Sequence, residues 1–240
     1  GLKRPVAFSV MVAALGAAIA VALPVFPVLC LSALMTGGAT GAASIALQRH
    51  VGRAAQNPTQ LKQVFSWLAI GPAISNFLGP FAAGLMIDHA GFRYAFLLMA
   101  LLPLATWFWV RRTRELPPVV RAAGDKPGRA WDLAREPMFR RLLIINWILA
   151  SCWDVHTFVV PVLGHERGLS ASVIGSILGA FAIAAALIRV VLPLIAERVS
   201  EAAVIATAMV VTAVLFGVYP LLHAPLAMGF CSVLLGLALG

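Results

Sequence analysis

The sequence predicts an all-α membrane protein with about eight membrane-spanning helices. Of its 240 residues, 61% are hydrophobic and 11% are charged, whereas soluble domains carry about 25% charged residues. The hydrophobic residues form long continuous runs, and a helix needs about 20 such residues to cross a bilayer. The runs lack the alternating polarity of membrane β-strands. We therefore predict a multi-spanning helical protein.

The predicted spans follow one another with short turns between them. Pro24 and Pro27 mark the first turn, Asn57-Pro58 the second, and Pro225 the last. The eight apolar runs cover residues 6–23, 28–48, 63–87, 94–110, 142–163, 171–195, 202–222 and 225–240.

Basic residues are concentrated in alternate loops. If consecutive helices run in opposite directions, the loops form two sets, one at each membrane surface. One set holds Lys3, Arg4 and most of the other Lys and Arg residues, whereas the other holds only Arg93 and Arg167. Because basic loops stay in the cytoplasm, we place the first set there and predict a protein of the cytoplasmic membrane. The formal charge of +9 then reflects membrane topology and is weak support for nucleic-acid binding.

Residues 111–141 form the only long polar stretch and divide the chain. Their prolines, glycines and basic residues predict a cytoplasmic linker. The second half, RAWDLAREPMF, is compatible with a short amphipathic helix on the membrane surface. We predict four spans of an N-terminal bundle in residues 1–110 and four spans of a C-terminal bundle in residues 142–240.

A glycine motif in the third span carries a resemblance to a known family. Residues 75–84 read SNFLGPFAAG, which resembles the GxxxGPxxGG antiporter motif in the fifth helix of the major facilitator superfamily. Gly79, Pro80 and Gly84 match the motif, while Ser75 and Ala83 stand where that family has glycine. The resemblance implies two pseudo-symmetric helix bundles.

The same span contains small residues at intervals of four. Gly71, Ser75, Gly79 and Ala83 fall on one side of a helix, which predicts a smooth seam for close helix packing. The two prolines of this span are expected to bend the helix without ending it. We predict that the seam packs against another helix of the same bundle and serves as a pivot.

Two further segments are similar to the cytoplasmic loop motif of that family. GLKRP at the start places Gly1, Lys3 and Arg4 at matching positions, and a degenerate copy places Glu197 and Arg198 after the sixth span. On this resemblance the chain corresponds to the third to tenth of twelve helices, and we expect it to be a fragment of a longer protein.

The resemblance implies a secondary transporter that moves a small molecule by alternating access. The glycine motif favours proton-coupled efflux. The fourth-helix arginine of many proton-coupled drug exporters has no counterpart at Ser32, Ala33 or Leu34, which favours uptake of a metabolite by proton symport. A non-transporting receptor or scaffold and a membrane-embedded enzyme are the alternatives from other classes. The expected partners of a monomer are the small molecule, protons and the lipid bilayer, without a cofactor or nucleic acid.

Asp154 is the clearest candidate for a coupling residue. It lies near the middle of the span 142–163, where a charged group is costly in lipid and is a site candidate by default. Trp147, Ser151 and Thr157 fall on the same face at 100° per residue. This face predicts a cavity wall that contacts substrate and protons. The alternative is a carboxylate that only bonds to a neighbouring helix.

Other polar residues within spans are weaker candidates. His156 lies about 200° around the helix from Asp154 and is predicted to pack against other helices. Arg189 is expected to extend toward the interface or Glu197, with an anion-binding role as the alternative. Asn146 is expected to face a neighbouring helix. The three cysteines and five histidines show no metal-ligand spacing, so we predict neither a metal site nor catalytic residues.

Overall fold

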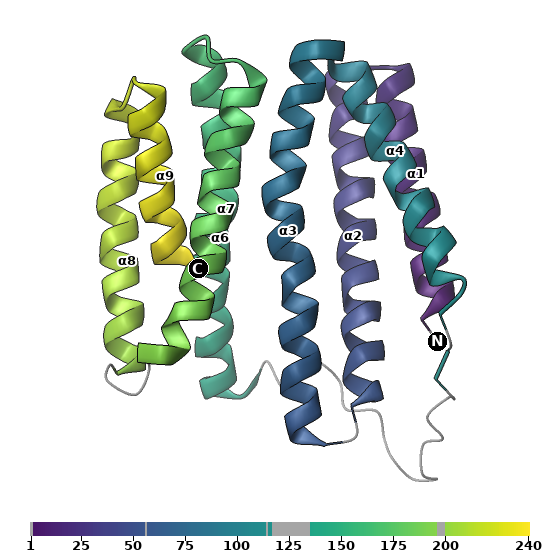
Figure 1. Cartoon of the computed structure of the whole chain (residues 1–240), viewed down its shortest axis with the longest axis horizontal. Helices are drawn as coiled ribbons and strands as arrows, with labels where there is room; N and C mark the ends of the chain where they lie inside the picture. The colour runs from purple at the N-terminus through teal and green to yellow at the C-terminus, as the bar shows by residue number, and fades with distance from the viewer. Residues whose placement is uncertain (1, 56, 114, 117–134, 196–199) are drawn as a thin grey trace. The chain divides into compact units, whose positions relative to one another are not determined.

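A computed structural model describes residues 2–55, 57–113, 115–116, 135–195 and 200–240, which form helices and turns without a strand. The helices are α1 (Lys3–Ala22), α2 (Phe26–Ala54), α3 (Pro58–Ala90), α4 (Phe92–Val110), α6 (Pro137–Glu166), α7 (Ala171–Ile195), α8 (Glu201–Val218), the 3-10 turn η2 (Tyr219–Leu221) and α9 (Pro225–Leu239) (Figure 1). Seven helices in this part of the chain are long and apolar enough to cross a membrane, and α9 is a shorter apolar helix. The predicted all-α membrane fold is confirmed.

The helix ends follow from proline, glycine and capping side chains. Asn57 caps α3 by accepting a hydrogen bond from the backbone N–H of Gln60 at 2.8 Å. The same helix continues through both of its internal Gly-Pro pairs and ends at Gly91, whose φ of 87° is unfavourable for side-chain-bearing residues. Proline at the first turn of α6 starts that helix within the predicted linker 111–141. Most of that linker and its proposed amphipathic helix lie outside the described residues.

The chain divides into two compact units. One contains α1, α2, α4 and the two ends of α3, whereas the other contains α6 to α9 with the middle of α3, Ala73–Leu85. The contacts thus group the middle of α3 with the later helices, and the division into bundles at residues 1–110 and 142–240 stays a prediction.

In the first unit, α1 packs against both α2 and α4 (Figure 1). Its buried residues are spaced by one, three or four positions and form one stripe: Val6, Ser9, Val10, Ala13, Gly16, Ala17 and Ala20. A Cβ added to Gly16 would lie 2.9 Å from the Cβ of Met35 on α2 and 3.3 Å from the carbonyl oxygen of Ser32. Small side chains therefore allow α1 and α2 to approach closely, as is usual between membrane helices.

In the second unit, α9 packs against α7 and α8 (Figure 1). The buried core joins α6, α7, η2 and α9, and Leu215 and Phe216 of α8 pack against it; its buried members are Val160, Ile177, Leu178, Phe181, Tyr219, Met228, Cys231 and Leu235. A Cβ on Gly236 would collide with the carbonyl oxygen of Phe181 and lie 2.9 Å from the Cβ of Ala184. This contact holds α7 against α9 and fixes the surroundings of α6.

Candidate functional site

Asp154 lies in the middle of α6, a helix of 30 residues. Its side chain is exposed on the surface of the second unit. Within the described residues its carboxylate makes no hydrogen bond or ion pair, and only its backbone carbonyl accepts a bond, from the hydroxyl of Thr157 at 3.0 Å. The carboxylate is therefore accessible, in the middle of an otherwise apolar helix.

The other residues predicted on this face lie beside Asp154 along α6. Trp147 is 71% exposed. Asn146, which the sequence predicts to face a neighbouring helix, is exposed in the second unit. Ser151 is half-buried and donates its hydroxyl proton to the carbonyl oxygen of Trp147 at 2.8 Å. The hydroxyls of Ser151 and Thr157 donate to carbonyl oxygens of their own helix. The Asp154 carboxylate, on the same face, has no hydrogen-bond or ion-pair partner among the described residues.

His156 lies on the opposite side of α6 and is 1% exposed. Its Nε2 lies 3.1 Å from the hydroxyl of Ser232 on α9, and that hydroxyl lies 2.9 Å from the hydroxyl of Tyr219. The imidazole stacks on Phe181 of α7 with ring centroids 4.2 Å apart. As the sequence predicts, this histidine packs between helices and faces away from Asp154.

Sequence reasoning did not identify the partners of His156. Ser232 is 76 positions away along the chain, and a single serine in an apolar run gives no signal of its own. The Nδ1 atom of His156 is buried with no hydrogen-bond partner among the described atoms. His156, Ser232 and Tyr219 therefore form a buried polar network, in which one ring nitrogen of His156 makes no hydrogen bond to a described atom.

Arg189 on α7 points toward the end of α9. Its Nε donates to the carbonyl oxygen of Gly240 at 2.9 Å, and its guanidinium lies 5.7 Å from the ring centroid of Trp153. The predicted alternative partner, Glu197, lies outside the described residues together with Arg198. Arg189 thus has a backbone and an aromatic partner, and neither contact involves the Asp154 carboxylate.

The glycine motif of α3 contacts α7, but not along the predicted seam. Among the described residues, a Cβ added to Gly71 or Gly79 would meet no atom within 4 Å. The close contacts belong to Gly84, where a Cβ would collide with the carbonyl of Ala171, and to Pro80, whose carbonyl approaches Gly175. The seam at Gly71 and Gly79 therefore stays a prediction, and the contacts with α7 are made by the neighbouring positions.

The rotation of α3 explains why Pro80 and Gly84 make the contacts with α7. Residues 80 and 84 share one side of a helix, and each lies about 100° around the axis from residues 79 and 83, respectively. On α7 the contact uses Gly175 and Gly179, and a Cβ on Gly179 would lie 2.9 Å from Phe77. These two glycines, four positions apart, are the sequence signal that could have identified the partner helix.

The predicted loop motif is described only in part. Gly1 is not described, whereas Lys3 and Arg4 form the first turn of α1. The backbone N–H of Lys3 donates to the carboxylate of Glu115 at 2.8 Å. Among the described residues, no three His, Cys, Asp or Glu side chains gather into a metal-binding group.

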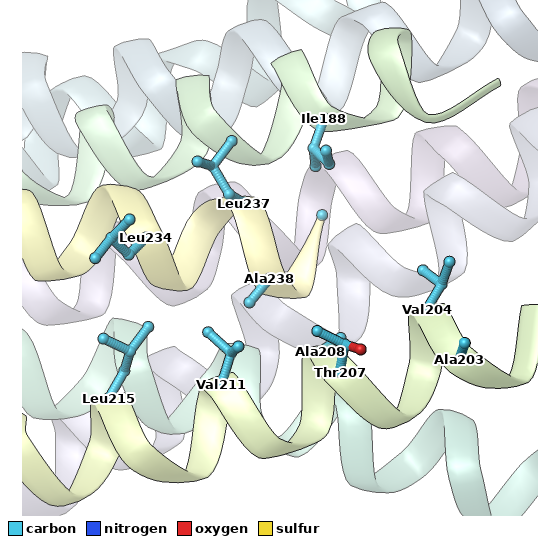
Figure 2. Close-up of a pocket in the computed structure, with 11 residues that line it drawn as sticks. Ile188, Ala203, Val204, Thr207, Ala208, Val211, Leu215, Leu234, Leu237 and Ala238 are labelled. Atoms are coloured by element: carbon cyan, nitrogen blue, oxygen red, sulfur yellow. The ribbon is translucent and has the colours of Figure 1, made fainter. Parts of the chain in front are cut away.

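A cavity of about 480 Å³ lies between α7, α8 and α9 (Figure 2). Val211 and Leu215 of α8 point toward α9, and Leu234, Leu237 and Ala238 complete much of the wall. Of the described residues that line it, only Thr207 has a polar side chain. Neither Asp154 nor His156 lines this cavity, so it offers little recognition of a polar substrate.

Long apolar helices in two compact units, with a charged residue in the middle of one helix, define a multi-pass membrane protein of transporter type. The sequence profile of the Major Facilitator Superfamily matches residues 1–240, and the chain belongs to this family. Membership of this family makes the chain a secondary transporter of a small molecule. No curated protein matches the chain in a sequence comparison.

Proposed function

We propose that this chain couples the movement of a small molecule to that of protons, and that Asp154 is the proton-coupling carboxylate. The observation that supports the proposal most strongly is the exposed, unpaired carboxylate of Asp154 among the described residues of α6. Trp147 on the same exposed face supplies an aromatic surface for the substrate.

The physical argument concerns the cost of a charge in lipid. A carboxylate at the centre of a membrane helix costs about 3 kcal/mol on insertion scales. A hydrogen bond to another helix would reduce this cost, but the Asp154 carboxylate has none within the described part of the chain. We infer that it faces a water-filled cavity, where it can take up and release a proton.

Proton coupling follows from the charge of this group. When Asp154 is ionised it attracts a proton or a cationic substrate, and occupancy by one disfavours binding of the other. Competition of this kind links the two fluxes in opposite directions, whereas joint binding links them in the same direction. Asp154 thus accounts for coupling in either direction.

We propose efflux by proton antiport, in a monomer of the cytoplasmic membrane. The resemblance of residues 75–84 to the antiporter motif supports this direction. Uptake by proton symport is the second candidate, favoured by the absence of an arginine at Ser32, Ala33 and Leu34.

Inverted membrane vesicles distinguish these directions. The lumen is first acidified by respiration, and lipophilic cations, antibiotics and small metabolites are then added one at a time. Antiport should make the lumen more alkaline when a substrate is added, whereas symport should make it more acidic. Transport of a labelled substrate without any change in lumenal pH would refute proton coupling.

A further inference from the structure

A small hollow of about 210 Å³ lies between the start of α1 and the end of α2, within the first unit. It is independent of Asp154, which belongs to the second unit. On α1 it is lined by Leu2 and Pro5, and on α2 by residues from Ala42 to Arg53. The charge pattern of the sequence places this end of the helices in the cytoplasm.

The spacing of residues on α2 creates the hollow. Ala42 and Ala46 lie one turn apart, and their short side chains leave space beside Leu2 and Pro5 of α1. His50 follows Ala46 by one more turn and is partly buried at the mouth. The small side chains of Ala42 and Ala46 therefore leave room for a ligand, and the His50 imidazole lines the hollow one turn further along α2.

Two arginines of α2 also line this hollow, on a side of the helix next to that of Ala42 and Ala46. Ile45, Arg49 and Arg53 follow one another at intervals of four and all line the hollow. Ile45 is 69% exposed, so an apolar surface continues from the arginines toward the middle of the helix. Basic groups at one end and apolar groups at the other match an amphiphilic ligand.

None of the described residues that line the hollow is acidic. Glu115 approaches this end of α1, where its carboxylate accepts the backbone N–H of Lys3 at 2.8 Å. That hydrogen bond lowers the pKa of Glu115, so the carboxylate stays ionised and bound to the backbone. Lys3 and Arg4 add positive charge in the first turn of α1.

We propose that this hollow binds the phosphate head group of an anionic phospholipid of the inner leaflet. Arginine binds phosphate oxygens through paired N–H groups, and basic pockets between membrane helices on the cytoplasmic side bind anionic head groups. The glycerol and first acyl carbons lie against Leu2, Pro5 and Ile45. An acyl chain distinguishes this ligand from free phosphate, which gains nothing from the apolar wall.

The test is native mass spectrometry of the full chain in detergent, titrated with phosphatidylglycerol, phosphatidylcholine or inorganic phosphate. The wild type should bind phosphatidylglycerol more tightly than phosphatidylcholine, and millimolar inorganic phosphate should not displace it. Equal binding of the two lipids overturns the proposal. Displacement by inorganic phosphate overturns its lipid part and assigns the hollow to a free anion.

Two double variants, each of which loses two positive charges, distinguish lipid binding in this hollow from a general attraction of anionic lipid to the protein surface. The double variant R49Q/R53Q should weaken phosphatidylglycerol binding by roughly 30-fold, from about 1 kcal/mol per basic residue. The control R140Q/R141Q removes two exposed arginines at the start of α6 and should bind as the wild type does. Equal weakening in both double variants contradicts the proposal.

A third variant tests the hollow without changing charge. Ala42→Leu places a larger side chain in the hollow at an exposed helical position. It should weaken binding of phosphatidylglycerol while the helical circular dichroism stays that of the wild type. Wild-type affinity in this variant would show that the basic residues act at the surface and that the hollow is not the site.

Discussion

Asp154 and His156 are two positions apart on α6 but have opposite surroundings. The Asp154 carboxylate is exposed and unpaired within the described residues. The His156 imidazole is 1% exposed, bonds to Ser232 and stacks on Phe181. The comparison shows that ionisable residues of one membrane helix can serve different purposes, because a separation of two residues turns the side chain by about 200°. Asp154 is then expected to affect transport, and His156 to affect stability.

The largest effect is expected from Asp154→Asn. The amide has almost the shape of the carboxylate but cannot exchange a proton, so proton-driven transport should fall to the level of membranes without the protein. Resistance of a pump-deficient host to a substrate compound measures this effect. Asp154→Glu should retain part of the activity, because it keeps the carboxylate. Full resistance with Asp154→Asn would assign coupling to another residue.

A similar contrast between neighbouring positions exists on α3. Gly84→Leu should abolish transport, since even a Cβ at this position collides with the Ala171 carbonyl of α7. Gly79→Leu is the matched control and should transport normally, because a Cβ at Gly79 meets no described atom within 4 Å. Transport by both variants, at equal amounts in the membrane, is the measurement. Loss in Gly79→Leu with activity in Gly84→Leu would restore the seam predicted from the sequence.

The third prediction concerns His156→Ala. Removing this buried ring leaves a cavity against Phe181 and should lower the free energy of unfolding in detergent by about 3 kcal/mol. Asp154→Asn is the control and should change it by less than about 0.5 kcal/mol, because its side chain is exposed. Thermal or denaturant unfolding followed by circular dichroism measures both. Equal unfolding free energies for the two variants would contradict the assignment of His156 to packing.

The smallest effect is expected from Ser232→Ala. The change removes the hydroxyl that lies between His156 and Tyr219, and should cost about 1 kcal/mol. Ser176→Ala is the control, because the exposed Ser176 hydroxyl bonds only to the Ser172 carbonyl of its own helix, at 2.8 Å. If Ser176→Ala lost as much stability as Ser232→Ala, the buried hydroxyl of Ser232 would contribute no more to stability than an exposed one.

Much of the fold could be predicted from the sequence, because membrane helices follow from continuous apolar runs and their turns from proline and asparagine. Asn57 and Pro58 start α3 as expected. The start of α6 was placed too late, since Arg140 and Arg141 were assigned to the linker although they lie in its first helical turns. Charge alone does not distinguish a helix end that extends into water from a loop.

Only those features of the site that depend on the geometry of a single helix could be predicted from the sequence. The 100° rotation per residue was enough to separate Asp154 from His156. It could not give Ser232 or Tyr219, whose contacts with each other and with His156 depend on how α6, α9 and η2 pack. For the same reason the sequence could not show that Pro80 and Gly84 contact α7, and the packing role of Gly71 and Gly79 stays a prediction.

The most direct test of the central claim measures proton movement and substrate exchange by the wild type and by Asp154→Asn in inverted vesicles. A substrate should change the lumenal pH of wild-type vesicles and leave it unchanged in the variant. Exchange of labelled for unlabelled substrate needs no proton movement, so the variant should still perform it. A substrate-driven pH change of wild-type size in Asp154→Asn would contradict the assignment of Asp154 as the coupling carboxylate.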